Sequence, residues 1–377
     1  MLPSPGLLFT IVSFLLVIGP LVFVHELGHY LVARWCGIGA ETFSIGFGHE
    51  IVGWTDKRGT RWKVGWLPLG GYVKFAGDMN AAGMPSDDWL MLPAEERART
   101  FQAKPVWQRF LVVAAGPVTN FLFAIVGFMV LFASFGELTS PPVIDGVEHG
   151  TPAASAGLRA GDRIVSIDGT PIEDFDDVAQ YVVIRPDQRM ELIIERDGQQ
   201  TTLPISTKSE IRKDPFGNQA RIGILGVRSG PLVFTKVPVA ELPEKAVKLT
   251  ADRLKMIVVT LKQLILGERS VHELGGPLKV AQISGQQASL GWVALLNLMA
   301  FISINLGFIN LLPVPMLDGG HLLFYVIEGV RRRPLKAKSQ EWAFRAGLAA
   351  LLMLMLMVTF NDLASFGLWS RLGGLIG

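Results

Sequence analysis

The sequence contains Val24-His25-Glu26-Leu27-Gly28-His29 near the end of an apolar stretch that runs from about Leu7 to Ala33. About 20 apolar residues in a helix cross the hydrocarbon core of a bilayer, so this stretch is long enough to span one. An ionisable residue inside such a span costs about 2.5–3.5 kcal/mol on insertion scales, and such residues are usually functional. The stretch therefore predicts a membrane-spanning helix whose ionisable residues have a function.

The two histidines and the glutamate have the spacing of a metal site. Residues four apart share one face of a helix, so His25 and His29 can both direct a ring nitrogen at one metal ion. Glu26 lies beside them and can act as general base on a water molecule at that metal. Zn²⁺ suits this chemistry because it lowers the pKa of water and polarises a carbonyl group. The alternative is a polar cluster that only joins neighbouring helices.

The composition favours an integral membrane protein. Of the 377 residues, 50% are hydrophobic and only 18% are charged, and the mean hydropathy of +0.38 is high for a soluble domain. The net charge is +2 and no basic run is interleaved with aromatic residues, which argues against nucleic acid as a partner. Cys36 is the only cysteine, so a metal site must use His, Asp or Glu.

Three further apolar stretches can span a bilayer, at about Phe110–Phe135, Trp292–Leu312 and Ala346–Phe360. The first stretch is not expected to be a signal peptide, because no Lys or Arg precedes it and no small-residue cleavage site ends it. We therefore predict a multi-pass α-helical membrane protein with four transmembrane helices.

The positions of the basic residues predict the orientation, because Lys and Arg concentrate in cytoplasmic segments. Ten basic residues lie from Arg34 to Arg109, and five more lie from Arg331 to Lys338. The residues before span one and residues 136–142 contain none. Both termini and the region 136–291 are thus expected outside the cytoplasm.

The outer region has the pattern of a separate β-rich module. From Pro141 to about Ile205, short alternating runs are followed by Asp-Gly pairs, which predicts strands and hairpins. Residues 150–162, Gly-Thr-Pro-Ala-Ala-Ser-Ala-Gly-Leu-Arg-Ala-Gly-Asp, resemble the PDZ domains of bacterial proteases. Such domains bind an extended peptide, usually a C-terminus, as an added strand. An unrelated small β domain is the alternative.

Two segments near the spans have unusual compositions. Residues 241–266 combine an apolar face with basic residues, so this helix is expected either on the membrane surface or against the module. Segment 41–75 is rich in Gly and aromatic residues and predicts hairpins that enter the membrane in part. Non-helical backbone at that depth must be paired or line a wet cavity.

A catalytic zinc ion commonly has three protein ligands and a water molecule, so a third ligand is needed. Asp318, in the run NLLPVPMLDGGH of residues 310–321, is the only acidic residue in or at the end of another span that fits. Under the predicted orientation it lies on the same membrane side as His25 and His29. His321 is a competing ligand, which we expect instead to pack or to support a ligand.

Asn120, Asn305 and Asn310 are polar residues inside predicted spans. Each could bond a neighbouring helix or hold the exposed backbone of a bound peptide, and for Asn120 we favour helix packing. A second His-Glu pair, His272-Glu273, has Gly276 where the second histidine is needed. It also lies outside the spans, so it predicts no site.

Taken in order, these motifs resemble the site-2 protease family of intramembrane zinc metalloproteases, in particular its regulator-of-sigma-E protease type. The resemblance covers residues 24–29, Arg109–Pro117, the PDZ-like module and residues 305–321. It implies that segment 41–75 pairs with substrate as an extra strand. The side chains that it assigns are His25, His29 and Asp318 for zinc, Glu26 for general-base catalysis, and Asn310 and Asn305 for substrate.

The implied function is hydrolysis of a peptide bond in or near the transmembrane segment of a single-span protein. The implied substrates are anti-sigma factors or remnant signal peptides. The implied place is the bacterial inner membrane, with both termini periplasmic and the active site near the cytoplasmic side. The regulator-of-sigma-E type has two PDZ domains in tandem, whereas this chain has room for one. A PDZ scaffold with a degenerate metal site and a metal transporter are the rival classes, and neither explains Glu26 beside His25.

The sequence is expected to divide at the following boundaries. Residues 1–40 hold span one, 41–108 the hairpin region and a loop, 109–136 span two, 137–207 the PDZ-like domain, 208–290 a following strand and an amphipathic helix, 291–330 span three with Asp318, 331–345 a cytoplasmic loop, and 346–377 span four and a tail.

Overall fold

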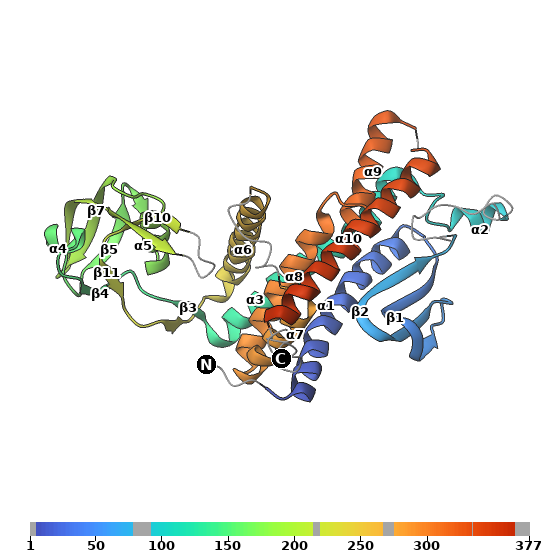
Figure 1. Ribbon diagram of the computed structural model, residues 1–377, viewed down its shortest axis with the longest axis horizontal. Coiled ribbons are helices and arrows are strands. Elements are labelled where there is room, and N and C mark those ends of the chain that lie inside the picture. The colour runs from blue at the N-terminus through green and yellow to red at the C-terminus, as the bar shows by residue number, and fades with distance from the viewer. Residues whose placement is uncertain (1–4, 78–91, 214–218, 267–274, 334, 366–377) are drawn as a thin grey trace, which may run out of the picture. The chain divides into compact units, whose positions relative to one another are not determined.

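The computed structural model describes residues 5–77, 92–213, 219–266, 275–333 and 335–365. The chain forms a helical unit of Met1–Val130, Pro243–Leu261 and Leu274–Gly377, and a β-rich unit of Leu131–Leu242 and Lys262–Glu273. Figure 1 shows long helices in the first unit and mostly strands in the second. The pair His272-Glu273, for which we predict no site, lies outside the described residues.

Four helices of the described chain are long and apolar enough to cross a membrane, which confirms the predicted multi-pass fold class. They are α1 (Leu7–Trp35), α3 (Val106–Phe135), α8 (Trp292–Leu311) and α10 (Ala337–Ser365). Outside the core of the β-rich unit, the other α-helices are α2 (Ala94–Ala98), α6 (Leu242–Ile265), α7 (Pro277–Ser289) and α9 (Asp318–Arg331). The segment expected as span three, 291–330, is therefore two helices, α8 and α9.

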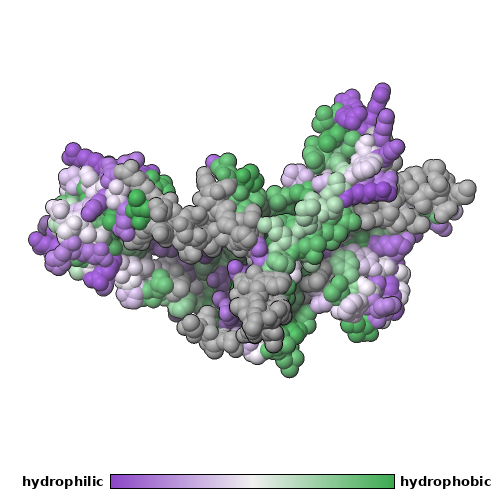
Figure 2. Space-filling view, viewed as in Figure 1, coloured by the Kyte–Doolittle hydropathy of each residue, from purple (hydrophilic) through white to green (hydrophobic). Residues whose placement is uncertain are grey.

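The membrane-spanning helices expose apolar side chains, as a bilayer requires. Every residue from Leu351 to Met357 in α10 is Leu or Met, and all of them are exposed. Figure 2 shows hydrophobic residues over much of the visible surface of the helical unit. Two polar side chains of the spans, Asn120 and Ser303, are instead buried, both at 0% exposed. This inside-out distribution fits a lipid environment and not water.

Segment 40–75 forms two long strands, β1 (Ala40–Thr55) and β2 (Arg61–Phe75), so the predicted hairpins are present. Residues 42–45 pair with residues 71–74 and also with residues 61–64, and the latter pair in turn with residues 52–55. The result is a layer of four strand segments in which the last part of β2 forms one edge. The layer packs on α1 through its aromatic residues, with the Phe43 and Tyr30 rings 5.9 Å apart.

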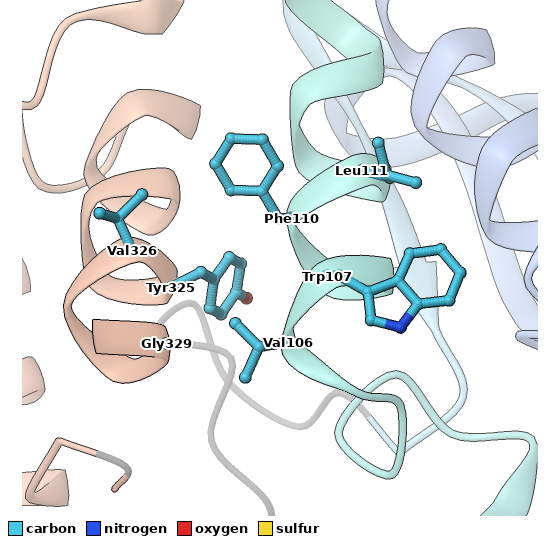
Figure 3. A pocket seen from close by; sticks show the side chains of 7 residues that line it. All are labelled: Val106, Trp107, Phe110, Leu111, Tyr325, Val326 and Gly329. Atoms are coloured by element: carbon cyan, nitrogen blue, oxygen red, sulfur yellow. The ribbon is translucent and has the colours of Figure 1, made fainter. Parts of the chain in front are cut away.

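Helices α3 and α9 are joined where α3 begins and α9 ends. Arg109 donates from Nη2 to Glu328 Oε1 at 2.7 Å in a largely buried ion pair, and its guanidinium lies 5.0 Å from the centre of the Tyr325 ring. Beside this pair, the two helices leave an apolar groove of about 540 Å³ (Figure 3). Its lining residues are Val106, Trp107, Phe110, Leu111, Tyr325, Val326 and Gly329. They include no candidate site residue, so the groove is not the reaction centre.

The β-rich unit contains an antiparallel sheet with the strand order β6-β5-β7-β8. Its strands are β5 (Arg163–Ile167), β6 (Thr170–Pro171), β7 (Arg189–Arg196) and β8 (Gln199–Ser206). The Asp-Gly pairs at 168–169 and 197–198 connect β5 to β6 and β7 to β8, and all four residues have positive φ. Two consecutive residues with positive φ are the mark of the tight hairpin turn that these pairs favour.

The remaining strands of this unit pair across long sequence separations. The pairs are β3 (Glu137–Thr139) with β12 (Val233–Thr235), β4 (Ile144–Val147) with β11 (Val227–Ser229), and β9 (Lys208–Lys213) with β10 (Gln219–Ile224). Two helices, α4 (Pro152–Ser155) and α5 (Phe175–Val183), pack on the same core. That core also contains Leu225, so the unit extends beyond the boundary expected at residue 207. The sequence pattern hides this because β4 precedes its partner β11 by about 80 residues.

The PDZ-like motif ends in a buried carboxylate. Asp162 is 1% exposed and accepts hydrogen bonds from Nε and Nη2 of Arg196 and from the backbone N–H of Arg159, each at 2.7 Å. Burial acts to raise the pKa of Asp162, but these hydrogen bonds and the charge of Arg196 hold it below its usual value. The motif is therefore structural at this position.

Asp162→Asn is expected to lower the unfolding free energy of the β-rich unit by about 2 kcal/mol, between the effects typical of surface and buried ion pairs. Because the folded-state pKa is depressed, the contribution is fully present above the unfolded pKa of about 3.9 and is lost as pH falls through the lower folded value. Hydrogen exchange of the β5 and β7 amides in the full chain measures it. The exposed Asp145, replaced by Asn, is the control, and equal effects of both variants at pH 7 would contradict this account.

Candidate metal centre

Helices α1 and α3 lie unusually close where the histidines project from α1. A Cβ atom added at Gly28 would come closer than 3.0 Å to the side chain of Thr119 and to the carbonyl oxygen of Ala115. One added at Gly116 would come closer than 3.0 Å to both His25 and His29. Packed atoms do not approach so closely. The two glycines therefore allow α3 to pack directly against the two imidazoles. This role of Gly28 and Gly116 was not predicted from the sequence.

The His29 ring is fixed by the main chain of α3. Its Nδ1 atom lies 2.8 Å from the carbonyl oxygen of Val112. A carbonyl oxygen only accepts hydrogen bonds, so Nδ1 carries the proton and Nε2 presents a lone pair. This Nε2 atom lies 3.3 Å from Nε2 of His25, and both histidines are buried. The predicted pair thus directs two ring nitrogens at one point.

Asp318 reaches the same point from a distant part of the chain. Helix α8 ends at Leu311, where the following prolines, Pro313 and Pro315, cannot continue it. After a turn in which Met316 has a φ of 83°, α9 begins with Asp318. The Asp318 Oδ2 atom lies 3.2 Å from His25 Nε2 and 3.5 Å from His29 Nε2. The structure thus brings all three predicted ligands together.

The arrangement of these donor atoms fits a tetrahedral zinc ion. Ligand atoms about 2.0–2.1 Å from such an ion lie about 3.3 Å from one another, close to the three separations of 3.2, 3.3 and 3.5 Å. Asp318 Oδ2 is buried and, apart from the imidazoles, has no hydrogen-bond partner among the described residues. A bound divalent cation would compensate the burial of three electron-pair donors that face one another at these distances. Across the described chain, this is the only such group of three or more His, Cys, Asp or Glu residues.

Glu26 lies on α1 beside the three donors and is 8% exposed. The edge of the β1–β2 layer crosses α1 at this point, since a Cβ atom at Gly71 would come closer than 3.0 Å to Glu26 Cγ and to Val22 Cγ1. Only glycine gives the strand this approach. The side chain predicted as general base therefore lies against a strand edge.

The other candidate residues occupy different positions. The amide nitrogen of Asn310 lies 3.5 Å from His25 Nε2, at the margin of the centre. The amide of Asn305 donates to the carbonyl oxygen of Phe301 in its own helix, at 2.9 Å. His321, the competing ligand, lies outside the donor cluster, and its ring packs 4.8 Å from that of Phe344.

Asn120 bonds a neighbouring helix, as favoured from the sequence, and its partner there is a candidate metal ligand. Its side-chain amide lies 3.0 Å from Nδ1 of His25, on the side of the ring opposite the donor cluster. The only sequence signal for this contact was a polar residue inside an apolar span, which does not identify its partner.

With this geometry described, the chain can be placed among known proteins. Residues 13–354 match the model of peptidase family M50, so the chain belongs to this family. It is accordingly a zinc metalloprotease, as predicted.

Relatives match along nearly the whole chain. A protein named as a zinc metalloprotease in Agrobacterium fabrum is 46% identical over 94% of this chain and 96% of its own length. Metalloprotease MmpA of Caulobacter vibrioides is 38% identical over 98% of this chain and 99% of its own length. Among solved structures, the PDZ domain of an SdrC-like protein from Listeria monocytogenes aligns with 23% of this chain and 84% of its own, at 19% identity and a TM-score of 0.19.

Proposed function

We propose that His25, His29 and Asp318 hold the zinc ion of this metalloprotease, and that the enzyme cuts peptide bonds within or near transmembrane segments. The observation that carries the proposal is the position of the donor cluster. It lies between α1, α3 and the start of α9, among membrane-spanning helices, and not in the β-rich unit. A peptide bond can reach this cluster only at the depth of these helices.

A transmembrane substrate must first unwind, because an intact helix hides its carbonyl groups in its own hydrogen bonds. Main-chain hydrogen bonds to the edge of the β1–β2 layer could replace the hydrogen bonds that the unwound substrate helix loses. Residues 71–74 pair with residues 42–45 on one side, and Gly71 brings this edge against Glu26. An extended substrate can add to the layer as a further strand there. Asn310 lies close enough to the donor atoms to hold the substrate backbone as well. Asn305, which precedes it on α8, is proposed to hold the substrate further from the metal.

The residues then divide the reaction between them. When bound, Zn²⁺ supplies a Lewis acid that polarises the scissile carbonyl and lowers the pKa of water. Glu26 takes a proton from the attacking water and later gives it to the leaving amine. Helix α3, through the Val112 carbonyl group, keeps His29 in the tautomer that leaves Nε2 free for the metal. Burial of the cluster keeps bulk water away from the unwound substrate.

The orientation and the partners are part of the same proposal. The basic residues between α1 and α3, and those after α9, favour the cytoplasmic side for these segments, which leaves both termini and the PDZ-like domain in the periplasm of a bacterial inner membrane. By family resemblance, the substrates are single-span proteins such as anti-sigma factors or remnant signal peptides. The PDZ-like domain binds a peptide or C-terminus of such a partner.

Metal removal tests this proposal. The purified chain in lipid vesicles is expected to cleave a model single-span substrate, to lose that cleavage after chelation, and to regain it with Zn²⁺. Mass spectrometry of the fragments locates the cut, which should lie within or near the transmembrane segment. Cleavage that persists in metal-free protein, or a cut confined to the soluble part of the substrate, would refute the proposal. A scaffold would bind the substrate and leave it intact.

A further inference from the structure

We propose that Asn120 is a positioning residue that orients His25 for the metal by accepting a hydrogen bond from its Nδ1–H group. This role rests on the proposed function, because it requires His25 Nε2 to be a zinc ligand. The side chain of Asn120 is 0% exposed, and the structure places its amide nitrogen Nδ2 3.0 Å from His25 Nδ1. A buried amide in a membrane-spanning helix is costly without a partner, and this imidazole is the partner that its side chain has among the described residues.

The chemistry of the ring decides which end of the amide faces it. A neutral imidazole that gives its Nε2 lone pair to a metal carries its proton on Nδ1. The atom opposite must then be an acceptor, so the amide presents Oδ1, which a half-turn about its last bond allows without change of shape. As the structure places the amide, Oδ1 is turned away from the ring and has no partner in the described chain, so no other residue there holds the amide in that orientation. The imidazole alone therefore selects the orientation.

The side chain of Asn120 is not what attaches α3 to α8. That attachment uses its main chain, whose carbonyl oxygen accepts a hydrogen bond from Ser303 Oγ at 2.8 Å. Gly307 of α8 allows the same close approach, since a Cβ atom there would lie 3.0 Å from the Pro117 carbonyl oxygen. Substitution of the Asn120 side chain leaves both of these main-chain contacts available. The packing of α3 against α8 thus does not account for the amide.

Both ligand histidines are then fixed in the same way from one helix. The Val112 carbonyl oxygen accepts from His29 Nδ1. In the proposed orientation the Asn120 amide oxygen accepts from His25 Nδ1, at the position where the structure places the amide nitrogen, 3.0 Å from the ring. These two acceptors are eight positions apart on α3, as His25 and His29 are four apart on α1, with Gly116 between them. Each ring is held between α3 and the metal, which sets its tautomer and its rotation. Such outer partners commonly contribute about 10–100-fold to metal affinity.

The test compares two substitutions of Asn120 in the full chain in lipid nanodiscs. Asn120→Leu has nearly the same size but accepts no hydrogen bond, and we expect it to weaken zinc binding about 10–100-fold in competition with a chromogenic chelator. Asn120→Asp retains an acceptor oxygen and lacks the amide donor, so we expect it to restore zinc affinity. If the native amide instead donated to Nδ1, Asn120→Asp would fail like Asn120→Leu. Failure of the Asp variant, or unchanged affinity in the Leu variant, would overturn the inference.

Ser303→Ala is the matched control for a role in packing. It removes the hydrogen bond between α8 and the Asn120 main chain, so it should lower thermal stability and leave zinc affinity unchanged. The same titration separates this inference from the proposed function. Wild-type protein that binds no zinc through His25, His29 and Asp318 would refute the proposed function. Wild-type protein that binds zinc there, with affinity insensitive to Asn120→Leu, would refute only the role of Asn120.

Discussion

The Glu26→Gln variant is expected to retain zinc and to cleave a model transmembrane substrate about 10²–10⁴ times more slowly than the wild type. That factor is what a well-placed general acid–base group contributes. Glutamine has the shape of glutamate but cannot take a proton from water. The three proposed ligands are on other residues, so metal binding should not change. Initial cleavage rates in lipid vesicles and metal analysis of the same protein samples provide the measurement.

A second substitution makes this result specific to proton transfer. Glu26→Asp keeps the carboxylate but withdraws it by one methylene group, so it should recover part of the activity that Glu26→Gln loses. Loss of zinc in Glu26→Gln would show that Glu26 is a ligand and not the base. Undiminished cleavage by a zinc-loaded Glu26→Gln enzyme would exclude Glu26 from the reaction.

The membrane helices could be predicted from the sequence because hydropathy is a local property. The stretch predicted from Leu7 to about Ala33 is α1, which ends at Trp35. The last span was predicted to begin at Ala346, whereas α10 begins at Ala337. The first turns of this helix consist largely of polar residues that precede the apolar stretch, and a hydropathy pattern detects only the apolar part. For the same reason, α9 could not be separated from span three until the turn around Met316 was visible.

The three donor residues could be predicted from the sequence, whereas the residues that surround them could not. The pair His25 and His29 has a fixed helical spacing, and Asp318 is an acidic residue at the end of a span, so all three could be chosen beforehand. Gly116 and Asn120 could not be, because their importance depends on which helix packs against α1. A glycine in an apolar helix has many uses, and only the tertiary structure shows that Gly116 faces the imidazoles.

Gly116→Ala is expected to abolish zinc binding and cleavage although it adds only one methyl group. The new Cβ atom would come closer than 3.0 Å to His29 Nε2 and to His25 Cε1, where the donors converge. Neither ring can easily move, since Nδ1 of His29 is held by Val112 at 2.8 Å and Nδ1 of His25 lies 3.0 Å from Asn120. We expect zinc affinity to fall at least about 100-fold, more than the loss of an outer hydrogen bond would cause.

The same substitution should leave α3 folded, because the overpacking cost of about 1–3 kcal/mol is offset in part by the gain of about 0.5–1 kcal/mol that alanine brings to a helix interior relative to glycine. Gly127→Ala, in the same helix, is the matched control. Its Cβ atom would lie 3.6 Å from that of Ala300, an ordinary contact. The control should keep full zinc affinity and activity and melt at or above the temperature of the metal-free wild type, whereas Gly116→Ala should melt somewhat lower but still cooperatively. Normal zinc binding in Gly116→Ala would show that the histidine rings do not lie against α3, and the geometry proposed for the metal centre would then be wrong.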